Sequence, residues 1–324
     1  MHAILQTQPG DADTLYLGSV ERPQAGPGQL LVRVNAAGVN RADIVQREGR
    51  YPPPPGASPI LGLELAGVVV EAGDGCRFGS GDAVFGLVGG GAYAEYALLD
   101  DALAIAKPAW LSWAEAASLP EAWLTAILNL TDVGQLKAGE SFLVHAGASG
   151  VGAAAIQLAK QLGARVFASA GSASKLAYCR RLGADEVFNY KEQSAFGQWI
   201  KERGGVDLVL DPIGASHIDE NIAALRRDGR LVVIGVMGGS NGQLNLGQLL
   251  MKRLRVQGST LRSQPLEVKA QLTQRLAERL DDFRSGRLRF TLDSRFDIAD
   301  AAAAHRHMES NANLGKIVLE WPAA

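Results

Sequence analysis

The stretch that decides the fold is ESFLVHAGASGVG, residues 140–152. An apolar run over residues 142–144 is followed by a turn dense in glycine. Beyond the turn, apolar side chains recur at helical spacing at Ala153, Ile156, Ala159 and Leu162. The stretch therefore predicts a strand, a tight turn and a helix.

Glycine at positions 147, 150 and 152 suits such a turn for two reasons. Glycine adopts positive φ without penalty, and its missing side chain lets backbone N–H groups approach a pyrophosphate. The helix that begins near Val151 directs its free N–H groups and positive dipole end at that anion. Ser149 replaces the middle glycine of the strict G-x-G-x-x-G pattern, and its hydroxyl is a phosphate donor. An ordinary βα turn is the alternative. We expect the pyrophosphate to bind at Gly147, Ala148, Ser149, Gly150, Val151 and Gly152.

Further strands and helices alternate after this turn. Strand-like runs cover residues 164–170, 185–190, 206–214 and 229–236. Helix-length segments lie between them at 174–182, 196–203 and 218–225. This alternation predicts a doubly wound parallel sheet with its ligand at the carboxyl ends of the strands. Residues 254–260 suit a sixth strand at an edge, where a second subunit could pair with it to form a homodimer.

The end of the second strand indicates which dinucleotide is bound. An NAD-preferring site carries an acidic residue there, but residues 169–172 read SAGS and the next carboxylate is Asp185. Without that acid, nothing repels a 2′-phosphate. We therefore expect NADPH, although Lys175 alone also fits a solvated helix position. The expected 2′-phosphate site comprises Gly171, Ser172, Lys175 and Tyr190.

Length and composition favour a soluble enzyme of about two domains. The chain has 324 residues, 47% of them hydrophobic and 20% charged. The net charge of −2 gives no general attraction to nucleic acid or acidic membranes. With no long apolar run and no leader-like start, we expect a cytoplasmic protein without membrane or nucleic-acid partners. The two cysteines suit structural thiols, and His305 and His307 suit the surface.

The first ~115 residues differ from the nucleotide-binding part. Residues 30–40, 62–73 and 82–99 are β-like runs between glycine and proline breaks, which predicts an antiparallel, barrel-like domain. Residues 111–128 are helical in pattern. After the nucleotide-binding part come an amphipathic helix, a strand at 288–296, a helix at 298–308 and a strand at 316–321. The apolar face of the amphipathic helix is Val268, Leu272, Leu276, Leu280 and Phe283.

The order of these parts and several long motifs resemble one family. The motifs are GVNRADIVQREGRYPPPPGASPILGLE (38–64), EAWLTA (121–126), HAGASGVGAAAIQLAK (145–160), LGADEVFNYK (182–191), LRS (261–263) and NLGKIVLE (313–320). They resemble the zinc-free quinone oxidoreductase branch of the medium-chain dehydrogenase/reductase superfamily, with the nearest likeness to its p53-inducible NADPH type. This resemblance implies an α/β protein in which a doubly wound Rossmann domain, residues 119–263, is inserted into a GroES-like β-rich catalytic domain, residues 1–118 plus 264–324.

The resemblance also implies a site without metal. In zinc-dependent relatives a cysteine stands where this chain has Asn40, and a histidine precedes the glutamate that is Glu64 here. The residue before Glu64 is Leu63, and two cysteines cannot form a four-cysteine zinc lobe. We expect no metal, and Glu64 to be a buried, paired carboxylate.

Several binding roles follow from the resemblance alone. It places Ile213 and Gly214 near the adenosine and ribose. The residues that it places around the nicotinamide are Asn40, Thr125, Met237, Leu261 and Ser263. It places Asn40 and Tyr51 in the catalytic pocket beside the glycines at 89–91. For Tyr51, the alternative is a turn anchor before four prolines.

A metal-free site suits an electron-poor acceptor, because hydride transfer to a quinone yields a resonance-stabilised anion. We therefore expect a zinc-independent NADPH:quinone reductase, with ortho-quinones among its substrates. Reduction of the activated C=C bond of an enone uses the same hydride geometry. A non-catalytic NADPH-binding sensor is the alternative outside enzymology.

Overall fold

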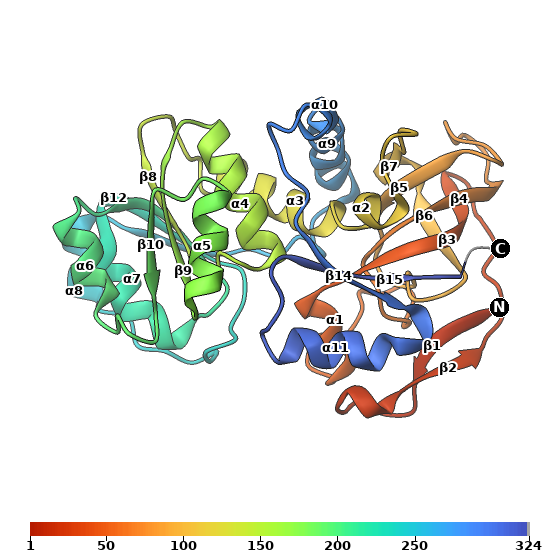
Figure 1. The fold of residues 1–324 in the computed structure, drawn as a ribbon, viewed down its shortest axis with the longest axis horizontal. Coiled ribbons are helices and arrows are strands. Elements are labelled where there is room, and N and C mark those ends of the chain that lie inside the picture. The colour runs from red at the N-terminus through yellow and green to blue at the C-terminus, as the bar shows by residue number, and fades with distance from the viewer. Residues whose placement is uncertain (323–324) are drawn as a thin grey trace. The chain divides into compact units, whose positions relative to one another are not determined.

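The computed structural model describes residues 1–322, which divide into two compact units. Unit 1 comprises residues 1–124 and 262–324, and unit 2 comprises residues 125–261. Helix α3 (Pro120–Ile127) carries the chain from the first to the second (Figure 1). The domain limits at 118/119 and 263/264 stay a prediction.

Unit 2 contains a six-stranded sheet in the order β10-β9-β8-β11-β12-β13. All neighbouring strands in it are parallel. The strands are β8 (Ser141–Val144), β9 (Arg165–Ala170), β10 (Glu186–Asn189), β11 (Val206–Asp211), β12 (Leu225–Val233) and β13 (Arg255–Gly258). The strand order reverses between β8 and β11, the point at which doubly wound sheets bind ligands at their carboxyl ends. The predicted Rossmann sheet is confirmed.

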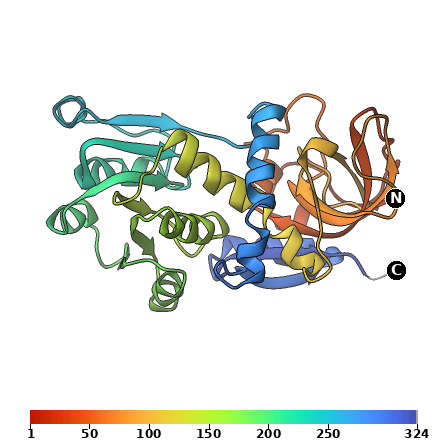
Figure 2. The ribbon, with the colours of Figure 1, turned by 90° about the horizontal axis from the view of Figure 1, so that it is seen from above.

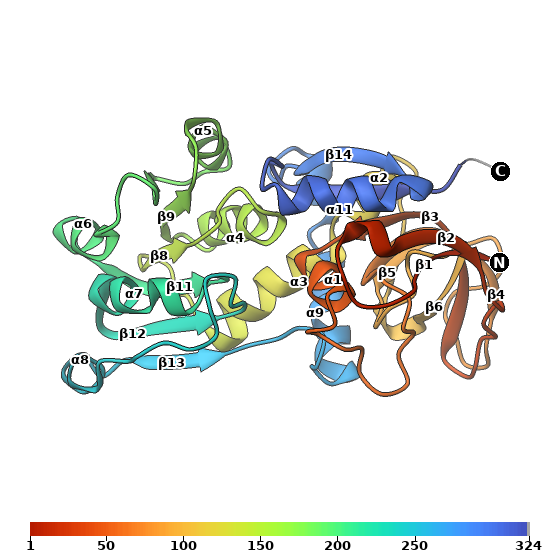
Figure 3. The same ribbon diagram turned by 90° about the horizontal axis from the view of Figure 1, so that it is seen from below.

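Helices connect these strands, as the alternation predicted. They are α4 (Gly150–Gln161), α5 (Ala173–Arg181), α6 (Phe196–Glu202), the 3-10 turn η4 (Ala215–His217), α7 (Ile218–Ala224) and α8 (Leu246–Lys252), and the π-helical turn η3 (Leu128–Val133) precedes the sheet. The core joins apolar side chains of the strands to those of α6 and α7, including Phe167, Val209, Ile200 and Ile222. Strand β13 runs along the edge of the sheet with α8 at one end, and all four of its residues are exposed (Figure 3).

Unit 1 contains a seven-stranded sheet in the order β14-β15-β3-β4-β5-β7, with β6 also paired to β3. Its strands are β3 (Gln29–Val39), β4 (Glu64–Ala72), β5 (Ala83–Leu87), β6 (Tyr96–Asp100), β7 (Ala104–Ala106), β14 (Leu292–Asp297) and β15 (Lys316–Glu320). Only the β14–β15 pair is parallel among these described pairings. A separate antiparallel ribbon joins β1 (His2–Gln6) to β2 (Leu15–Ser19). This is the GroES-like β-rich unit that the sequence predicts.

Short helices surround this sheet. They are η1 (Ala12–Thr14), α1 (Arg41–Arg47), η2 (Asp101–Leu103), α2 (Trp113–Ala117), α9 (Leu266–Ala277), α10 (Leu280–Arg284), η5 (Ile298–Asp300) and α11 (Ala301–Glu309). Helix α9 lies beside η2 and β7 (Figure 2). The core of the unit is apolar and includes Leu30, Val32, Leu65 and Ile317. Within residues 1–322, no helix combines the length and the apolar character that crossing a bilayer requires.

Two expectations about the last part of the chain are wrong. The single amphipathic helix over residues 268–283 is two helices, α9 and α10, separated by a turn at residues 278–279. Leu272, Leu276 and Phe283 are nevertheless buried, so the apolar spacing continues across a break that it cannot reveal.

His305 was expected at the surface and is instead fully buried. Its Nδ1 lies 3.3 Å from Arg47 Nη1, and its Nε2 lies 3.2 Å from the Tyr93 hydroxyl. Burial lowers the pKa of His305 to about 3, so the ring is neutral. Its partners are more than 200 residues away in the chain, which the local sequence could not show.

Candidate functional site

The glycine turn, residues 147–152, joins the end of β8 to the start of α4. Ser149 is the N-cap of this 12-residue helix, and its Oγ accepts from the N–H of Gly152 at 3.0 Å. The N–H groups of Gly150 and Val151 find no acceptor among residues 1–322. Two open donors, the Ser149 hydroxyl and the helix dipole together suit an anion, and its binding there stays a prediction.

One of the two reasons given for these glycines is wrong. None of Gly147, Gly150 and Gly152 has positive φ, and the residue that does is Ala146, at 51°. The second reason, the approach of backbone N–H groups to a pyrophosphate, stays a prediction, but the glycines do allow close packing within the protein. A Cβ on Gly152 would lie 2.3 Å from the carbonyl oxygen of Ala146, and one on Gly147 would lie 2.9 Å from Cys179 Sγ. The glycines let the turn, β9 and α5 pack against one another.

Residues predicted for the 2′-phosphate lie together at the carboxyl ends of β9 and β10, which are parallel neighbours. A Cβ on Gly171 would lie 2.7 Å from the Tyr190 hydroxyl, so these two residues are in contact. Ser172 caps α5, and its Oγ accepts from the N–H of Lys175 at 3.4 Å. The structure thus brings all four predicted residues to one edge of the sheet.

The carboxylate nearest in sequence, Asp185, lies at the other end of these strands. It accepts from the N–H of Val166, at the start of β9, and from Lys160 Nζ at 2.8 Å. Its charge is therefore committed to Lys160 and lies away from the carboxyl end of β9. The absence of an acid beside the 2′ position stays a prediction.

The predicted adenosine loop is held by Asp211, the last residue of β11. Its carboxylate accepts from the N–H groups of Ile213, at 2.6 Å, and Gly214, at 3.2 Å. Gly214 has φ of 84°, which favours glycine. Burial raises the pKa of Asp211 to about 6. The carboxylate therefore fixes the loop backbone that the resemblance places near the ribose.

Sequence reasoning missed a buried chain of hydrogen bonds that supports Asp211. Asn221 donates to Asp211 Oδ2 at 2.9 Å, and its Oδ1 lies 2.7 Å from His145 Nε2. His145 Nδ1 in turn lies 2.8 Å from Ser169 Oγ. Burial lowers the pKa of His145 to about 3, so a neutral imidazole links three strands and α7. The polar residues in otherwise apolar strands were the available signal.

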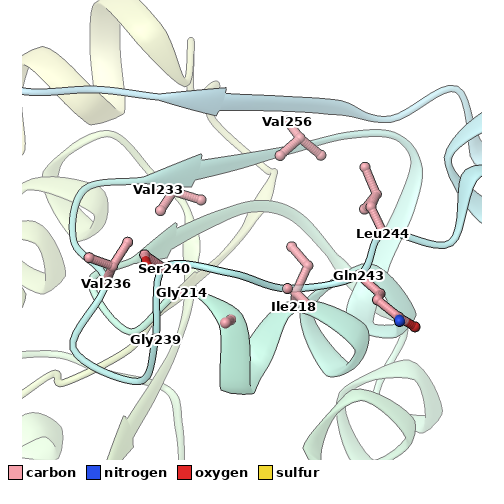
Figure 4. A pocket seen from close by; sticks show the side chains of 11 residues that line it. Gly214, Ile218, Val233, Val236, Gly239, Ser240, Gln243, Leu244 and Val256 are labelled. Atoms are coloured by element: carbon pink, nitrogen blue, oxygen red, sulfur yellow. The ribbon is translucent and has the colours of Figure 1, made fainter.

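A pocket of about 230 Å³ opens beside Gly214 (Figure 4). Apolar side chains of Ile218, Val233, Leu244 and Val256 line it. No residue of the glycine turn lines it. It therefore borders the predicted adenosine loop without containing the predicted phosphate site.

The residues predicted around the nicotinamide come from both units. Asn40 and Ser263 belong to unit 1, whereas Thr125, Met237 and Leu261 belong to unit 2. Asn40, Thr125 and Leu261 are buried, and the Met237 residue is half exposed. Their meeting around one ring stays a prediction.

In unit 1, Asn40, Glu64 and Lys316 form a buried group that we call the Lys316 cluster. Lys316 Nζ donates to Glu64 Oε1 at 2.5 Å, to Asn40 Oδ1 at 2.6 Å and to the carbonyl oxygen of Val39. Asn40 Nδ2 donates to Glu64 Oε1 at 2.9 Å, and the N–H of Glu121 donates to Glu64 Oε2 at 2.8 Å. Glu64 is buried and paired, as expected, but sequence reasoning gave Lys316 no role.

Two further carboxyl groups lie close to this cluster. Burial raises the pKa of Asp43 to about 6, although it accepts from the N–H groups of Asn40 and Gly62. Burial and then the charge of Glu64 raise the pKa of Glu121 to about 8. At neutral pH, Glu121 therefore carries a proton that an ordinary glutamate would have lost.

Arg262 contacts both Tyr51 and the glycine segment at 89–91. The Arg262 guanidinium carbon is 5.3 Å from the centre of the Tyr51 ring, and its Nη2 donates to the carbonyl oxygen of Gly89 at 2.7 Å. Burial raises the pKa of Tyr51, and the charge of Arg262 opposes that rise. Sequence reasoning named Leu261 and Ser263 but passed over Arg262 between them.

Comparison with known proteins shows which family has this architecture. Two family models match, the alcohol dehydrogenase GroES-like domain over residues 26–109 and the zinc-binding dehydrogenase over residues 150–278. The mycobacterial protein Rv1454c, solved with NADPH, is 32% identical, with 99% of each chain covered and a TM-score of 0.89. The chain belongs to the medium-chain dehydrogenase/reductase superfamily.

Other known proteins are similar over nearly the whole length of this chain. The Escherichia coli quinone oxidoreductase, solved with NADPH, is 29% identical, with a TM-score of 0.89 over 99% of this chain and 100% of that one. The CurK enoyl reductase is 28% identical, with a TM-score of 0.86 over 99% of each chain. The polyketide synthase system protein NorB of Streptomyces orinoci is 36% identical over 321 residues, which are 97% of this chain. The chain spans only 14% of NorB and 14–18% of similar synthases.

The superfamily includes zinc enzymes, but the side chains present here do not match a zinc site. The resemblance places the cysteine and histidine ligands of zinc enzymes at Asn40 and Leu63, and Leu63 offers no donor atom. The ammonium group of Lys316 already forms an ion pair with the Glu64 carboxylate. Within residues 1–322, no three His, Cys, Asp or Glu side chains are grouped to hold a metal ion.

Proposed function

We propose that this chain is an NADPH-dependent reductase that transfers hydride to quinones, ortho-quinones among them, without zinc. The observation that carries the proposal is the Lys316 cluster. The ammonium group of Lys316 donates hydrogen bonds to the Glu64 carboxylate and to the Asn40 side-chain amide, the groups that would otherwise face a metal. An acceptor at this site must therefore take a hydride without metal activation, which an electron-poor quinone does.

The choice of NADPH rests on the carboxyl ends of β9 and β10. Ser172 and Tyr190 offer hydroxyl donors to a 2′-phosphate and Lys175 offers an ammonium donor, beside the backbone of Gly171, and Asp185 is held by Lys160 away from them. The glycine turn offers its N–H groups to the pyrophosphate. Proteins of the superfamily that were solved with NADPH support the same choice.

When bound, NADPH supplies the hydride, and the chain supplies position and a dry environment. We assign Asn40, Thr125, Met237, Leu261 and Ser263 to the nicotinamide, and Ile213 and Gly214 to the adenosine and ribose. Asn40 is fixed by two partners, Glu64 and Lys316, so its orientation is set before the cofactor binds. Tyr51 offers a hydroxyl and an aromatic face to the acceptor.

The test is turnover of NADPH with 1,2-naphthoquinone and a panel of quinones in the presence of a zinc chelator. We expect NADPH consumption that the chelator leaves unchanged and that NADH supports less well. No turnover with any quinone would reject the proposal, and loss of turnover on chelation would reject its zinc-free part.

A second function, reduction of an enone C=C bond, is favoured by the similarity to the CurK enoyl reductase and to synthases such as NorB. The two reactions are separable with NADPH deuterated at C4. An enone product keeps the deuterium on carbon, whereas deuterium delivered to a quinone oxygen exchanges with water. Faster turnover of enones than quinones, with retained deuterium, would replace the first function by the second.

The proposal includes a homodimer that forms through β13. This edge strand is exposed along its length, and Leu246, Leu250 and Met251 of the neighbouring α8 are each more than two-thirds exposed. Sedimentation at micromolar concentration tests it, and a monomer would contradict it. The p53-inducible subtype and a cytoplasmic location, to which two free cysteines are suited, belong to the same proposal.

A further inference from the structure

Arg262 carries a guanidinium nitrogen that has no partner. The residue is 7% exposed, and its Nη1 is shielded from water without a hydrogen-bond acceptor among residues 1–322. A buried donor without an acceptor loses its hydration and gains nothing in return, and the loss is larger for a charged group. The unpaired nitrogen can take an acceptor from a ligand and, unlike the equally unpaired Nε of Arg279, belongs to a guanidinium that lies against Tyr51 of the predicted pocket.

The rest of the guanidinium is held firmly. Nε and Nη2 both donate to the carbonyl oxygen of Gly89, at 3.2 and 2.7 Å. Lys269 Nζ donates to the carbonyl oxygen of Arg262 itself at 2.8 Å, which fixes the backbone. Three contacts thus position Arg262 while one nitrogen is left over.

Nearby carboxyl groups do not accept a hydrogen bond from Arg262 Nη1. Glu121 and Asp43 act on Arg262 electrostatically, yet neither accepts from Nη1 in the described part of the chain. The positive charge of Arg262 is therefore available to a ligand.

Tyr51 covers the guanidinium with its ring, 5.3 Å from the guanidinium carbon. Tyr51 is half-buried, and its hydroxyl has no hydrogen-bond partner among residues 1–322. Because Nη1 is shielded, a ligand oxygen needs its cover to move before it can bind there, and the Tyr51 hydroxyl, on the ring over the guanidinium, is a second donor nearby.

We propose that Arg262 Nη1, together with the Tyr51 hydroxyl, binds the acceptor oxygen on which negative charge develops, so that the site selects carbonyl electrophiles whose reduced form is an oxyanion. This inference rests on the proposed reductase function and adds a charge-stabilising residue to it. For a quinone, the C–H bond of the reduced nicotinamide nucleotide breaks, an O–H bond forms on one oxygen and the electron pair reduces the ring. The other oxygen becomes an oxyanion at Arg262 and then takes a proton from water.

A direct test uses 4-nitrocatechol, whose phenolate absorbs visible light and which resembles a reduced ortho-quinone. Titration of wild-type protein should show binding, with the bound phenol ionising at lower pH than the free one, because a guanidinium favours the phenolate. No binding, or an unchanged ionisation, would overturn the inference without any variant.

Arg262→Met should weaken binding of this probe by about tenfold to a hundredfold. Arg262→Lys, which keeps the charge but loses the planar fork, should lie between Met and wild type. The matched control is Arg279→Met, because Arg279 also has a buried nitrogen, Nε, without a partner and lies in the same unit. The control should bind the probe as wild type does.

Turnover separates the inference from the proposed function. Arg262→Met should lower kcat with quinones on the order of a hundredfold, with NADPH affinity by fluorescence titration unchanged. Equal probe affinity in Arg262→Met and Arg279→Met, or a loss confined to NADPH affinity, would overturn the role of Arg262. Absence of any turnover in the wild type would instead reject the reductase, whatever the probe shows.

Discussion

The polar groups of the Lys316 cluster in unit 1 satisfy one another, whereas those of the glycine turn in unit 2 remain open. Glu64 receives hydrogen bonds from Asn40, Lys316 and the backbone of Glu121. The N–H groups of Gly150 and Val151 receive no acceptor in the described chain. The paired groups of the Lys316 cluster stabilise the fold and orient Asn40. The unpaired N–H groups of the glycine turn suit the binding of an anion. Changes to the two regions should therefore affect different measurements.

The largest effect is expected from Lys316→Met. It leaves the Glu64 carboxylate buried beside Asn40 without its cation, and breaking a buried ion pair costs about 3–5 kcal/mol. Urea unfolding of wild type and variant measures the loss. Glu64→Gln combined with Lys316→Met should recover most of it, because no uncompensated charge is left. An unchanged free energy of unfolding in Lys316→Met would show that Lys316 does not form the buried ion pair with Glu64.

The next effect belongs to the open region. Gly152→Ala places a Cβ 2.3 Å from the carbonyl oxygen of Ala146, so the turn must shift. We expect NADPH affinity to fall on the order of a hundredfold, with the urea midpoint changed much less. Gly79→Ala is the control, since a Cβ there meets no atom within 4 Å. Unchanged NADPH binding by Gly152→Ala would remove the phosphate site from this turn.

A smaller effect should distinguish the two nucleotides. Lys175→Ala removes an ammonium group from the first turn of α5, and we expect about a tenfold loss of NADPH affinity with little change for NADH. Calorimetric titration with each nucleotide measures both. Equal losses for the two would mean that the 2′-phosphate is bound elsewhere.

The smallest expected effect is a pH dependence of unit 1. Glu121 has a folded-state pKa raised to about 8 by burial and by Glu64, while the unfolded chain has the usual value near 4.5. Between these values the folded state binds the extra proton, so the stability contributed by Glu121 falls as pH rises from about 4.5 to 8. Lys316 and Arg262 oppose this shift, and Asp43 adds to it.

Glu121→Gln should remove that slope, so wild type should lose stability relative to the variant across this pH range. Because water reaches part of the Glu121 side chain, we expect a difference well below the one that the same pKa shift would give for a fully buried group. Unfolding curves at several pH values measure it. A wild type that gains stability relative to the variant as pH rises would reverse the assignment.

The same contrast explains what the sequence could reveal. The strands, the helices and the glycine turn of unit 2 follow local spacing, so the Rossmann sheet was predictable, although strand bounds such as those of β12 (Leu225–Val233, predicted at 229–236) differ by a few residues. The contact between Gly171 and Tyr190 followed from parallel strands whose ends must meet. The spacing of apolar residues could not predict the positive φ of Ala146. It also could not predict the hydrogen-bond chain from Ser169 to Asp211.

Unit 1 depends on contacts distant in the chain, and prediction there was weaker. Resemblance indicated Asn40 and Glu64, but their cation comes from Lys316, 252 residues beyond Glu64. Arg262 reaches Gly89 across 173 residues, and His305 reaches Arg47 across 258. Short strands and turns carry no periodic signal that pairs such residues, so the surface placement of His305 was wrong and Arg262 was missed.

The central claim is that unit 2 binds a phosphorylated nicotinamide nucleotide for a metal-free hydride transfer in this chain. Calorimetric titration of chelator-treated protein with NADPH and with NADH tests it most directly. The account predicts saturable heat with NADPH and an affinity about tenfold or more above that for NADH. Absence of heat with both nucleotides, or tighter binding of NADH, would contradict it.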